Sequence, residues 1–556
     1  MKLDIKRNRI LIQGDVKSLD SLNIQGYRGD NISKKATCNL DINAVNEICR
    51  QKQCTATDKL KAWYITEREK IKKANNAQKT CKKYDNVDYN LIDVKAKNYQ
   101  VQAVNFFLST GNALISYGMG LGKTLISIMI IKHIKKNTKA KILVVCPAYL
   151  KYSYAHELKK WSNLSYTIID GTPKKRDFLF KEHQEKEKDV LIINYEQIRV
   201  KKGTNKKKTE YNMHDYIKNT IFDLVIWDEA HRLKNKDSQI TCGAYSIKAD
   251  KKLMLTGTPI TKNAGEIFSL LSILDNKRFR SYWTFVDYYC NILYTDYGQK
   301  AGSIKRITEY QNILKAYMIR KLMADVAKHL PEKVFTEIPV VMYEEQEKAY
   351  NRAMKEFLNP DDSIIGSDVE RFIRLCQINQ NPAILGGKDV SISRDATLDL
   401  ISDIGEQRII VACTYIGMST NLKNSIEKST KGRNVYLINS KVKDREKVIN
   451  DFKRDNSGIL VTTIKCLAEG VNLDCCDYII FTDIDWNYGI NEQFKGRIYR
   501  MTSTRTKFYY YIIVKNTVHE YKHKKIAGEQ LEMTNTLGDS EQNIIRKFLN
   551  DFKKNV

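Results

Sequence analysis

The chain has 556 residues, of which 42% are hydrophobic and only 7 are Pro, so wholesale disorder is excluded and two or three domains are expected. Lys and Arg number 93 against 65 Asp and Glu, which gives a formal net charge of +28. An excess of this size favours a phosphate-rich partner, with nucleic acid as the default interpretation. The alternative is codon bias, because Lys, Asn, Ile and Tyr are all abundant, as in an AT-rich coding sequence.

The cysteines and the N-terminal residues indicate an intracellular protein. None of the 12 Cys forms a CxxC pair, and the four in the first 90 residues fit no zinc-ligand spacing. No apolar segment follows Met1–Arg7, which argues against secretion, and apolar stretches such as Leu125–Ile131 are too short for a membrane span. We therefore expect a soluble, cytoplasmic or nuclear protein with no membrane partner.

Residues 1–90 form the first expected domain, a small basic accessory domain. They hold 19 basic and 11 acidic side chains, a net charge of +8 that is nearly twice their share of the total. Within them, Lys59–Lys83 predicts a single basic helix. Contact with DNA is one interpretation of this charge. A solvated helix face is the alternative, because most charge runs are solvated.

The rest of the chain predicts two α/β lobes. Short apolar runs separated by helix-length segments are typical of parallel strands that are covered on both faces. The expected strands are Ala113–Ser116, Ile142–Cys146, Val190–Ile193, Leu224–Trp227, Leu253–Leu255, Arg408–Ala412, Val435–Ile438, Ile459–Val461, Tyr478–Phe481 and Phe508–Val514. The expected fold is therefore α/β, with doubly wound parallel sheets in lobes at 91–275 and 396–530. A helical insertion is expected at 276–395, a C-terminal helical tail at 531–556 and a lysine-rich loop at 201–208.

The segment Gly118–Thr124 follows an expected strand and opens an expected helix, which is the context of a P-loop. Glycines let backbone N–H groups surround a phosphate, the Lys123 ammonium group reaches the β- and γ-phosphates, and the Thr124 hydroxyl suits Mg²⁺. The expected nucleotide-binding positions here are Gly120, Leu121, Gly122, Lys123 and Thr124. Tyr117 replaces the first glycine of the full pattern, and a chance Gly-Lys-Thr in a glycine-rich loop is the alternative.

Asp228 and Glu229 stand at the end of an expected strand, where a parallel sheet presents side chains to its ligand. Asp228 is predicted to hold Mg²⁺ and Glu229 to orient and polarise the attacking water. Paired acids at a strand end are often only a helix cap, but a P-loop about a hundred residues upstream makes that alternative weak. The first lobe is therefore predicted to bind and hydrolyse a nucleoside triphosphate.

The segment Asp228–Asn235 followed by Leu255–Ile260 resembles the superfamily-two helicase-like ATPases of the Swi/Snf type. RNA helicases with the same acidic box usually have Ser-Ala-Thr where this chain has Thr256–Pro259, so that branch is disfavoured. Further matching pieces, in chain order, are Tyr99–Gln100 with Val104–Phe107, Cys146–Ala148 with Trp161, Asn194–Glu196, Met318–Lys321 with Asp325–Val326, and Leu330–Lys333. The resemblance covers about residues 95–525 and implies two RecA-like lobes, use of ATP and Mg²⁺, and an adenine-reading role for Gln100.

The second lobe continues the resemblance with Gly470–Leu473, Asp485–Asn487 and Gln493–Arg500. The last of these resembles the family motif that supplies arginine fingers to the ATP held by the other lobe. It implies catalytic roles for Arg500 as first choice, Arg497 as second choice, and Gln493, with Gly470 at the nucleotide. A guanidinium group brought in from a second lobe stabilises charge on the transferring phosphoryl group and makes hydrolysis depend on lobe closure. Departures from the family pattern are Tyr117-Gly118, Ala468-Glu469 and Met501-Thr502.

The resemblance also implies the substrate and the function. Relatives of this type hold the backbone of duplex DNA, and the implied contacts are Asn194, Thr258 and Thr462 to phosphates and Trp486 as an aromatic contact. We expect a monomeric DNA-dependent ATPase, of compact bacterial or viral form, that moves on duplex, forked or branched DNA without sequence preference in repair, recombination or replication. The alternatives are a transcription-linked ATPase that acts on a polymerase and a non-hydrolysing DNA clamp. The retained Lys123, Asp228, Glu229 and Arg500 argue against the clamp.

Overall fold

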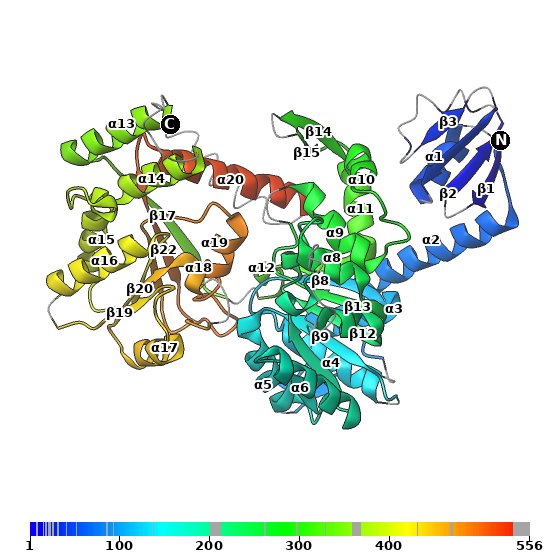
Figure 1. Cartoon of the computed structure of the whole chain (residues 1–556), viewed down its shortest axis with the longest axis horizontal. Coiled ribbons are helices and arrows are strands. Elements are labelled where there is room, and N and C mark those ends of the chain that lie inside the picture. Colours follow the sequence, from blue (N-terminus) through cyan, green and yellow to red (C-terminus); the bar gives the residue numbers. More distant parts are fainter. Residues whose placement is uncertain are drawn as a thin grey trace. The chain divides into compact units, whose positions relative to one another are not determined.

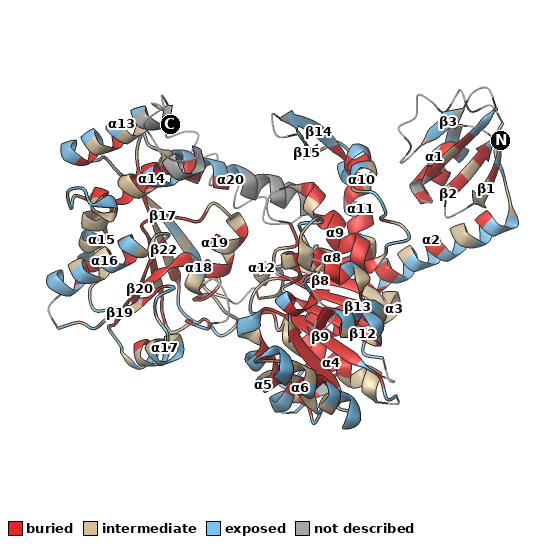
Figure 2. Cartoon of the chain, in the orientation of Figure 1, coloured by how far each residue is buried: buried red, intermediate tan, exposed pale blue. Residues whose placement is uncertain are grey.

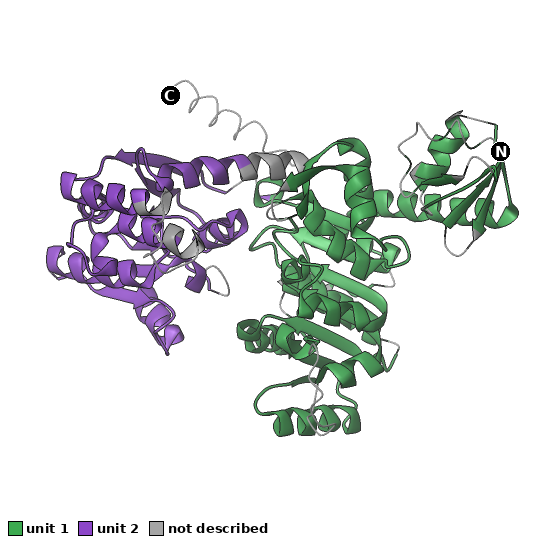
Figure 3. Ribbon diagram, turned by 45° about the horizontal axis from the view of Figure 1, so that its top comes forward, with its two compact units in different colours: residues 1–326, 533–556 green, residues 327–532 purple. Residues whose placement is uncertain are grey.

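The computed structural model of the chain is shown in Figure 1. It describes residues 1–556 except 201–212, 359–367, 468–470 and 538–556, several short gaps within the first 95 residues, and 137, 261–262, 296–297, 328–329 and 431. The predicted lysine-rich loop and most of the predicted C-terminal tail lie outside the described residues. The chain divides into two compact units, 1–326 with 533–556 and 327–532 (Figure 3). None of the described helices combines the length and the apolar composition that crossing a membrane requires.

The first unit begins with a small sheet of five strands in the order β3-β4-β2-β1-β5. Its elements are β1 (Lys2–Lys6), β2 (Arg9–Gln13), β3 (Arg28–Asp30), β4 (Lys35–Asn39), α1 (Ile42–Gln51) and β5 (Thr55–Ala56). Strand β2 alternates, with Ile10 and Ile12 fully buried, because only one face of this sheet is covered. Their side chains join Leu3, Ile48 and Leu60 in one apolar cluster, so this part of the chain has a core of its own.

Helix α2 (Asp58–Lys79) confirms the predicted basic helix, although it ends at Lys79 because the next residue, Thr80, is extended. Its first turn is capped by Thr57, whose side chain accepts a hydrogen bond from the backbone N–H of Leu60. Glu67, Ala74 and Ala77 are buried along the side that packs against α3 (Asn98–Thr110) and α11 (Ile307–Tyr317). The helix thus connects the small sheet to the first α/β lobe.

The first α/β lobe is built on a sheet of seven parallel strands in the order β10-β11-β9-β12-β13-β8-β16. The strands are β8 (Asn112–Tyr117), β9 (Ile142–Cys146), β10 (Tyr166–Ile168), β11 (Val190–Asn194), β12 (Ile221–Asp228), β13 (Lys248–Leu255) and β16 (Met318–Lys321). The other elements include β6 (Asn90–Leu91), β7 (Val94–Lys95), α4 (Lys123–Lys135), α5 (Lys151–Trp161), α6 (Pro173–Glu185), α7 (Met213–Asn219), α8 (Gln239–Ser246), α9 (Ile267–Leu274), α10 (Tyr282–Tyr289) and α12 (Met323–Val326). The central strands are buried on both faces, as Figure 2 shows, which is why they read as continuous apolar runs.

The second unit contains a sheet of six parallel strands in the order β17-β22-β21-β18-β20-β19. Its strands are β17 (Lys333–Val340), β18 (Ile409–Cys413), β19 (Val435–Ile438), β20 (Ile459–Thr463), β21 (Tyr478–Phe481) and β22 (Lys507–Val514). Its helices are α13 (Glu344–Leu358), α14 (Asp368–Gln380), α15 (Ile392–Ile404), α16 (Ile416–Ser429), α17 (Arg445–Arg454), α18 (Ile464–Leu467), α19 (Tyr488–Lys495) and the part of α20 (Val518–Leu537) up to residue 532. The predicted α/β class with two tandem parallel-sheet lobes is confirmed.

The segment 276–395 was expected to be helical, and this expectation needs correction. Besides helices, its described residues form four strands, which are the hairpin β14 (Cys290–Thr295) with β15 (Gly298–Ile304) and the edge strands β16 and β17. Strand β16 pairs with β8 and strand β17 with β22, so both complete sheets of the lobes. Edge strands are exposed along one side and carry charged residues, and this weakens the apolar pattern from which strands are predicted.

A buried charged cluster ties α20 to the end of β21 in the second unit. Asp483 accepts a hydrogen bond from the Lys522 ammonium group at 2.9 Å, lies 3.3 Å from Nε2 of His519, and pairs with the Thr414 hydroxyl. Asp483, Lys522 and His519 are each at most 3% exposed in their side chains. Although burial raises it, the charge of Lys522 and the hydrogen bond from His519 hold the pKa of Asp483 far below its ordinary value.

We expect Asp483→Asn to lower the free energy of unfolding of the second unit by about 3–5 kcal/mol, because Lys522 loses its buried counter-charge. Since the folded pKa of Asp483 is depressed, its contribution is complete above the unfolded pKa near 4 and is lost as the pH falls further. The difference between variant and wild type should therefore shrink below about pH 4. Hydrogen exchange of β18 and β21 amides measures this, with β8 as the internal reference.

The matched control for this prediction is Lys525→Ala. Lys525 is an exposed residue of α20, the helix that carries Lys522. Its Nζ atom lies 5.7 Å from the centroid of the Trp486 ring. Its replacement should change the unfolding free energy by no more than about 0.5 kcal/mol. Equal effects of the two substitutions would show that the buried cluster has no special role in stability.

Candidate nucleotide-binding site

The P-loop lies between the end of β8 and the start of α4. Gly120 and Gly122 have φ angles of 77° and 72°, in the left-handed region that glycine adopts without strain. A Cβ atom at Gly122 would lie 2.5 Å from Nε2 of Gln100, so a side chain at this position would displace the Gln100 amide group. A glycine-rich turn that leads directly into a helix N-terminus is an arrangement that binds phosphate.

Lys123 is the first residue of α4, and its ammonium group lies within the loop. Its Nζ atom donates hydrogen bonds to the carbonyl oxygens of Tyr117, at 3.0 Å, and of Gly118, at 3.4 Å. A Cβ atom at Gly257 would be 3.8 Å from the same Nζ atom, so the loop after β13 closely approaches the lysine. The geometry thus fits the phosphate-binding role predicted for Lys123.

Two side chains hold the P-loop against α3. The Oε1 atom of the buried Gln100 accepts a hydrogen bond from the backbone N–H of Lys97, and its Nε2 atom donates to the Leu121 carbonyl at 3.3 Å. Tyr117 is fully buried, and its hydroxyl donates to the carbonyl oxygen of Tyr99 at 2.7 Å. The departure from glycine at position 117 therefore has a structural reason, because Tyr117 is a strand residue that anchors the loop.

The predicted acidic pair stands at the carboxyl end of β12, beside β13. Asp228 is the last residue of the strand and is 6% exposed, and Glu229 follows with a φ of 52°. The backbone N–H of Glu229 donates to Oδ1 of Asp228 at 3.0 Å. Burial, followed by the charge of Glu229, raises the pKa of Asp228 to about 7, against the lowering effect of Lys123. A divalent cation would favour the ionised form of Asp228, so this carboxylate is suited to bind a cation.

His231 connects Glu229 to the loop after β13. It lies in a short 3₁₀ helix (Ala230–Leu233), and its Nδ1 atom is 3.2 Å from both Oε2 of Glu229 and Oγ1 of Thr256. The same Thr256 hydroxyl oxygen accepts a hydrogen bond from the backbone N–H of Thr258 at 3.2 Å. A continuous polar connection therefore runs from the predicted water-orienting carboxylate to Thr258, one of the predicted DNA contacts.

Glu157 is a third acidic residue at this site and was not among the predicted site residues. It lies on α5 and accepts a hydrogen bond from the Thr124 side chain. Burial raises the pKa of Glu157, and the charge of Glu157 in turn raises the pKa of Asp228. The sequence signal that could have pointed to Glu157 is helical spacing, because this residue lies on the same side of α5 as the buried Tyr154 and Leu158.

These residues fit a nucleotide-bound Mg²⁺. Thr124 and Asp228 offer a hydroxyl and a carboxylate, and Mg²⁺ usually takes one or two protein oxygens together with substrate phosphates and water. Within the described part of the chain, no group of three or more His, Cys, Asp or Glu side chains is placed to hold a metal ion by itself. The donor set therefore suits a cation that arrives with the phosphates.

The arginines predicted as fingers lie in the second unit, after α19. Nη1 of Arg497 and Nη2 of Arg500 both donate to the Val471 carbonyl, at 3.2 and 3.1 Å, and the backbone N–H of Arg500 donates to Ser503 Oγ. Burial lowers the pKa of the Arg500 guanidinium group, and the charge of Asp474 opposes this effect. Gln493 is 5% exposed. The two guanidinium groups are thus held together at the Val471 carbonyl. Gly470, the predicted nucleotide contact just before Val471, lies outside the described residues.

The predicted DNA contacts differ in their exposure. Thr258 and Asn194 are half-buried residues, and among the described residues the Thr258 hydroxyl and Oδ1 of Asn194 are buried atoms without a hydrogen-bond partner. Thr462, by contrast, is fully buried in β20 and donates its hydroxyl to the Thr463 carbonyl, and its contact with a phosphate stays a prediction. Strand β20 has a neighbouring strand on each side in the sheet, and the apolar sequence of the strand does not indicate whether the Thr462 side chain is buried. Trp486 is half-buried beneath the ammonium groups of Lys522 and Lys525.

The fold and the site together define a protein with two parallel-sheet lobes, of which the first carries a P-loop and an acidic pair. The chain belongs to the SNF2-related family, whose domain model matches residues 99–383, just over half of the chain. A second family model, the helicase conserved C-terminal domain, matches residues 393–502. The predicted resemblance to Swi/Snf-type ATPases is therefore confirmed.

Relatives of the chain occur in bacteria and animals. An "uncharacterized ATP-dependent helicase" of Mycoplasma pneumoniae is 24% identical over 490 residues, covering 82% of this chain and 44% of its own. A human SWI/SNF-related matrix-associated actin-dependent regulator of chromatin, subfamily A member 1, is 24% identical over 453 residues, which cover 76% of this chain and 42% of the human one. The chain thus spans less than half the length of these relatives. The structure of a Sulfolobus solfataricus SWI2/SNF2 ATPase core in complex with dsDNA has 20% identity and a TM-score of 0.39, covering 83% of this chain and 97% of that one.

Proposed function

We propose that the protein is an ATP-driven translocase that moves on duplex or branched DNA and remodels forks, junctions or bound proteins. The observation that carries this proposal is the meeting of the P-loop lysine, Asp228 and Glu229 at one sheet edge in a chain of the SNF2-related family. The relatives' names as ATP-dependent helicases support ATP as the nucleotide. The net charge of +28 supports a polyanionic track such as DNA.

In the proposed reaction, the P-loop backbone and Lys123 bind the ATP phosphates and Gln100 contacts the adenine. Thr124 and Asp228 would hold Mg²⁺, which when bound would supply positive charge to the phosphates. Glu157 positions Thr124 through their hydrogen bond. Glu229 orients the attacking water and accepts its proton, and His231 fixes the direction of the Glu229 carboxylate.

The proposed contribution of the second unit is positive charge. Arg500, with Arg497 as the second candidate, stabilises the charge that develops on the transferring phosphoryl group. The polar connection from Glu229 through His231 and Thr256 to Thr258 gives a physical route by which DNA contact changes the catalytic carboxylate. Hydrolysis should therefore respond to bound DNA.

The proposal predicts that duplex and forked DNA raise the ATP hydrolysis rate of the full chain, while RNA does not. Lys123→Ala should abolish both the basal and the stimulated rate, because the P-loop loses its phosphate-binding ammonium group. Lys139→Ala is the matched control, since Lys139 lies on the surface of the same unit and pairs with Glu187 at 2.7 Å. A rate that RNA stimulates more than DNA, or a stimulated rate that persists in Lys123→Ala, would overturn the proposal.

A further inference from the structure

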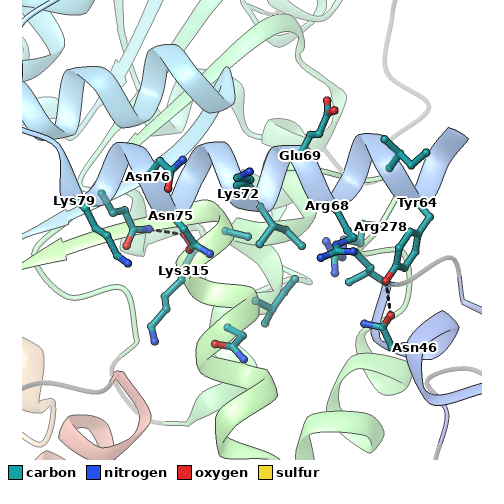
Figure 4. A pocket seen from close by; sticks show the side chains of 17 residues that line it. Asn46, Tyr64, Arg68, Glu69, Lys72, Asn75, Asn76, Lys79, Arg278 and Lys315 are labelled. Carbon is teal, nitrogen blue, oxygen red and sulfur yellow. Dashed lines mark hydrogen bonds between the residues drawn. The ribbon is translucent and has the colours of Figure 1, made fainter. Parts of the chain in front are cut away.

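A broad groove runs along α2 in the first unit, away from the P-loop. It has a volume of about 1090 Å³ and is lined by one side of α2, by α11 and by parts of α1. Figure 4 shows its labelled side chains, with Tyr64 and Asn46 joined by a hydrogen bond of 2.6 Å at one end and Lys315 near the other. All of its walls belong to one compact unit, so the groove is a feature of that unit alone.

The groove is fixed in shape by contacts on both sides of α2. Nε2 of Gln78 donates to the Lys315 carbonyl at 2.5 Å and to the Met318 carbonyl at 3.1 Å, which holds the end of α2 against α11. Nearer its middle, Glu67 and Arg278 form an ion pair of 3.0 Å in which both side chains are about 10% exposed. The walls are therefore pre-formed, which lowers the cost of binding a ligand between them.

The charge of the groove is strongly positive. Its exposed cations are Arg68, Lys72 and Lys79 on α2 and Lys315 on α11. In the described part of the chain, none of these four forms an ion pair with a carboxylate, in contrast to Arg278. Glu69 also lines the groove and adds one negative charge, so the exposed cations outnumber it by four to one. The positive groups are thus free to meet an anionic ligand.

The spacing of these side chains matches an extended polyanion rather than a compact anion. Tyr64, Arg68, Lys72, Asn75 and Lys79 recur every three or four residues and so form one stripe along α2. From Tyr64 to Lys79 the stripe rises about 22 Å at 1.5 Å per residue. Along one strand of duplex DNA, with one phosphate per 3.4 Å of axis, this corresponds to about six nucleotides.

We infer that the α2–α11 groove binds the phosphate backbone of duplex DNA, as a second DNA site besides the one on the motor lobes. Lysine and arginine neutralise the phosphates, while the amide groups of Asn75 and Asn76 donate hydrogen bonds to backbone oxygens. Contacts of this kind carry no sequence information, so the groove fixes the position of DNA on the protein. The inference takes its ligand from the proposed function but requires no ATP hydrolysis.

The test replaces three groove cations in the full chain, as Lys72→Gln, Lys79→Gln and Lys315→Gln together. The control replaces three exposed lysines of α2 outside the groove, as Lys59→Gln, Lys61→Gln and Lys73→Gln, with the same change in charge. Affinity for a duplex oligonucleotide is measured by fluorescence anisotropy at several salt concentrations. The slope of log affinity against log salt should fall by about 2 to 3 for the groove variant, since each lost phosphate contact removes about 0.9. The slope should stay near the wild-type value for the control.

Three outcomes would overturn the inference. The first is an equal change of slope in both variants, which would reduce the groove to general surface charge. The second is the absence of DNA binding by the wild type. The third is displacement of the oligonucleotide by poly-glutamate as effectively as by unlabelled DNA at equal charge, which would assign the groove to an acidic protein segment.

The ATP hydrolysis rate separates this inference from the proposed function. The basal rate without DNA should be unchanged in the groove variant, because the groove lies outside the nucleotide site. If DNA never stimulates hydrolysis but the groove variant still loses its salt slope, the proposed function fails and the DNA site stands. If DNA stimulates the wild type and the groove variant binds with an unchanged slope, the DNA site fails and the proposed function stands.

Discussion

Replacement of Arg500 by Ala is expected to lower kcat for ATP hydrolysis by about 10³- to 10⁵-fold, the range associated with loss of an arginine finger. The reason is that, in the proposed reaction, the Arg500 guanidinium group is the first candidate to stabilise the charge on the transferring phosphoryl group. ATP binding should weaken far less, since the P-loop is unchanged. Steady-state hydrolysis and equilibrium binding of a fluorescent nucleotide measure the two effects separately.

Arg505→Ala is the matched control for this prediction. Arg505 belongs to the same segment, but its side chain is 63% exposed and pairs with Asp477 at 3.1 Å. Because Arg500 also donates to the Val471 carbonyl, hydrogen exchange of β22 should show that the Arg500 variant remains folded. Full turnover by a folded Arg500 variant would move the finger role to Arg497 or exclude it.

Glu229→Gln should lower kcat by about 10²- to 10⁴-fold, which is the usual contribution of a general base. The substitution keeps the size of the side chain and removes the group that accepts the proton of the attacking water. ATP affinity should be retained, because Glu229 does not hold the phosphates in the proposed reaction. A rapid-quench measurement of a single turnover shows whether the chemical step itself is slowed.

The control for this second prediction is Glu187→Gln, which removes an exposed carboxylate of the same unit that pairs with the exposed Lys139 at 2.7 Å. It should hydrolyse ATP at the wild-type rate. A similar loss in both variants would indicate a general electrostatic effect, and an unchanged rate in Glu229→Gln would remove Glu229 from the reaction.

The buried parallel strands and the P-loop could be predicted because local sequence determines them. Strands such as β9 and β12 are covered on both faces and therefore appear as continuous apolar runs. Gly120 and Gly122 stand where positive φ angles are needed, and the lysine follows at once. Asp228 could be placed at the sheet edge because the strand before it is easily recognised.

Features that depend on long-range contacts could not be predicted. The ladder of β16 with β8 joins residues about two hundred positions apart, and its short, partly charged sequence gives no apolar signal. Glu157 reaches Thr124 only because α5 packs beside α4. The burial of Thr462 follows from the position of β20 inside its sheet, which neither its residue type nor its motif reveals.

The positive charge gains a more definite location from the structure. The sequence shows a net charge of +8 in the first 90 residues and a basic helix within them. The structure shows that Arg68, Lys72 and Lys79 of this helix face a pre-formed groove, while Lys59, Lys61 and Lys73 do not. Basic side chains of one helix therefore lie in two environments, which is what makes a charge-matched comparison between them informative.

ATP-dependent displacement of a triplex-forming oligonucleotide from duplex DNA tests the central claim most directly, because only movement along the duplex removes the third strand. The wild-type chain should displace the third strand with ATP, and Glu229→Gln should bind the same DNA and ATP without displacing it. If the wild type binds duplex DNA and hydrolyses ATP but leaves the third strand in place, the protein is not a translocase.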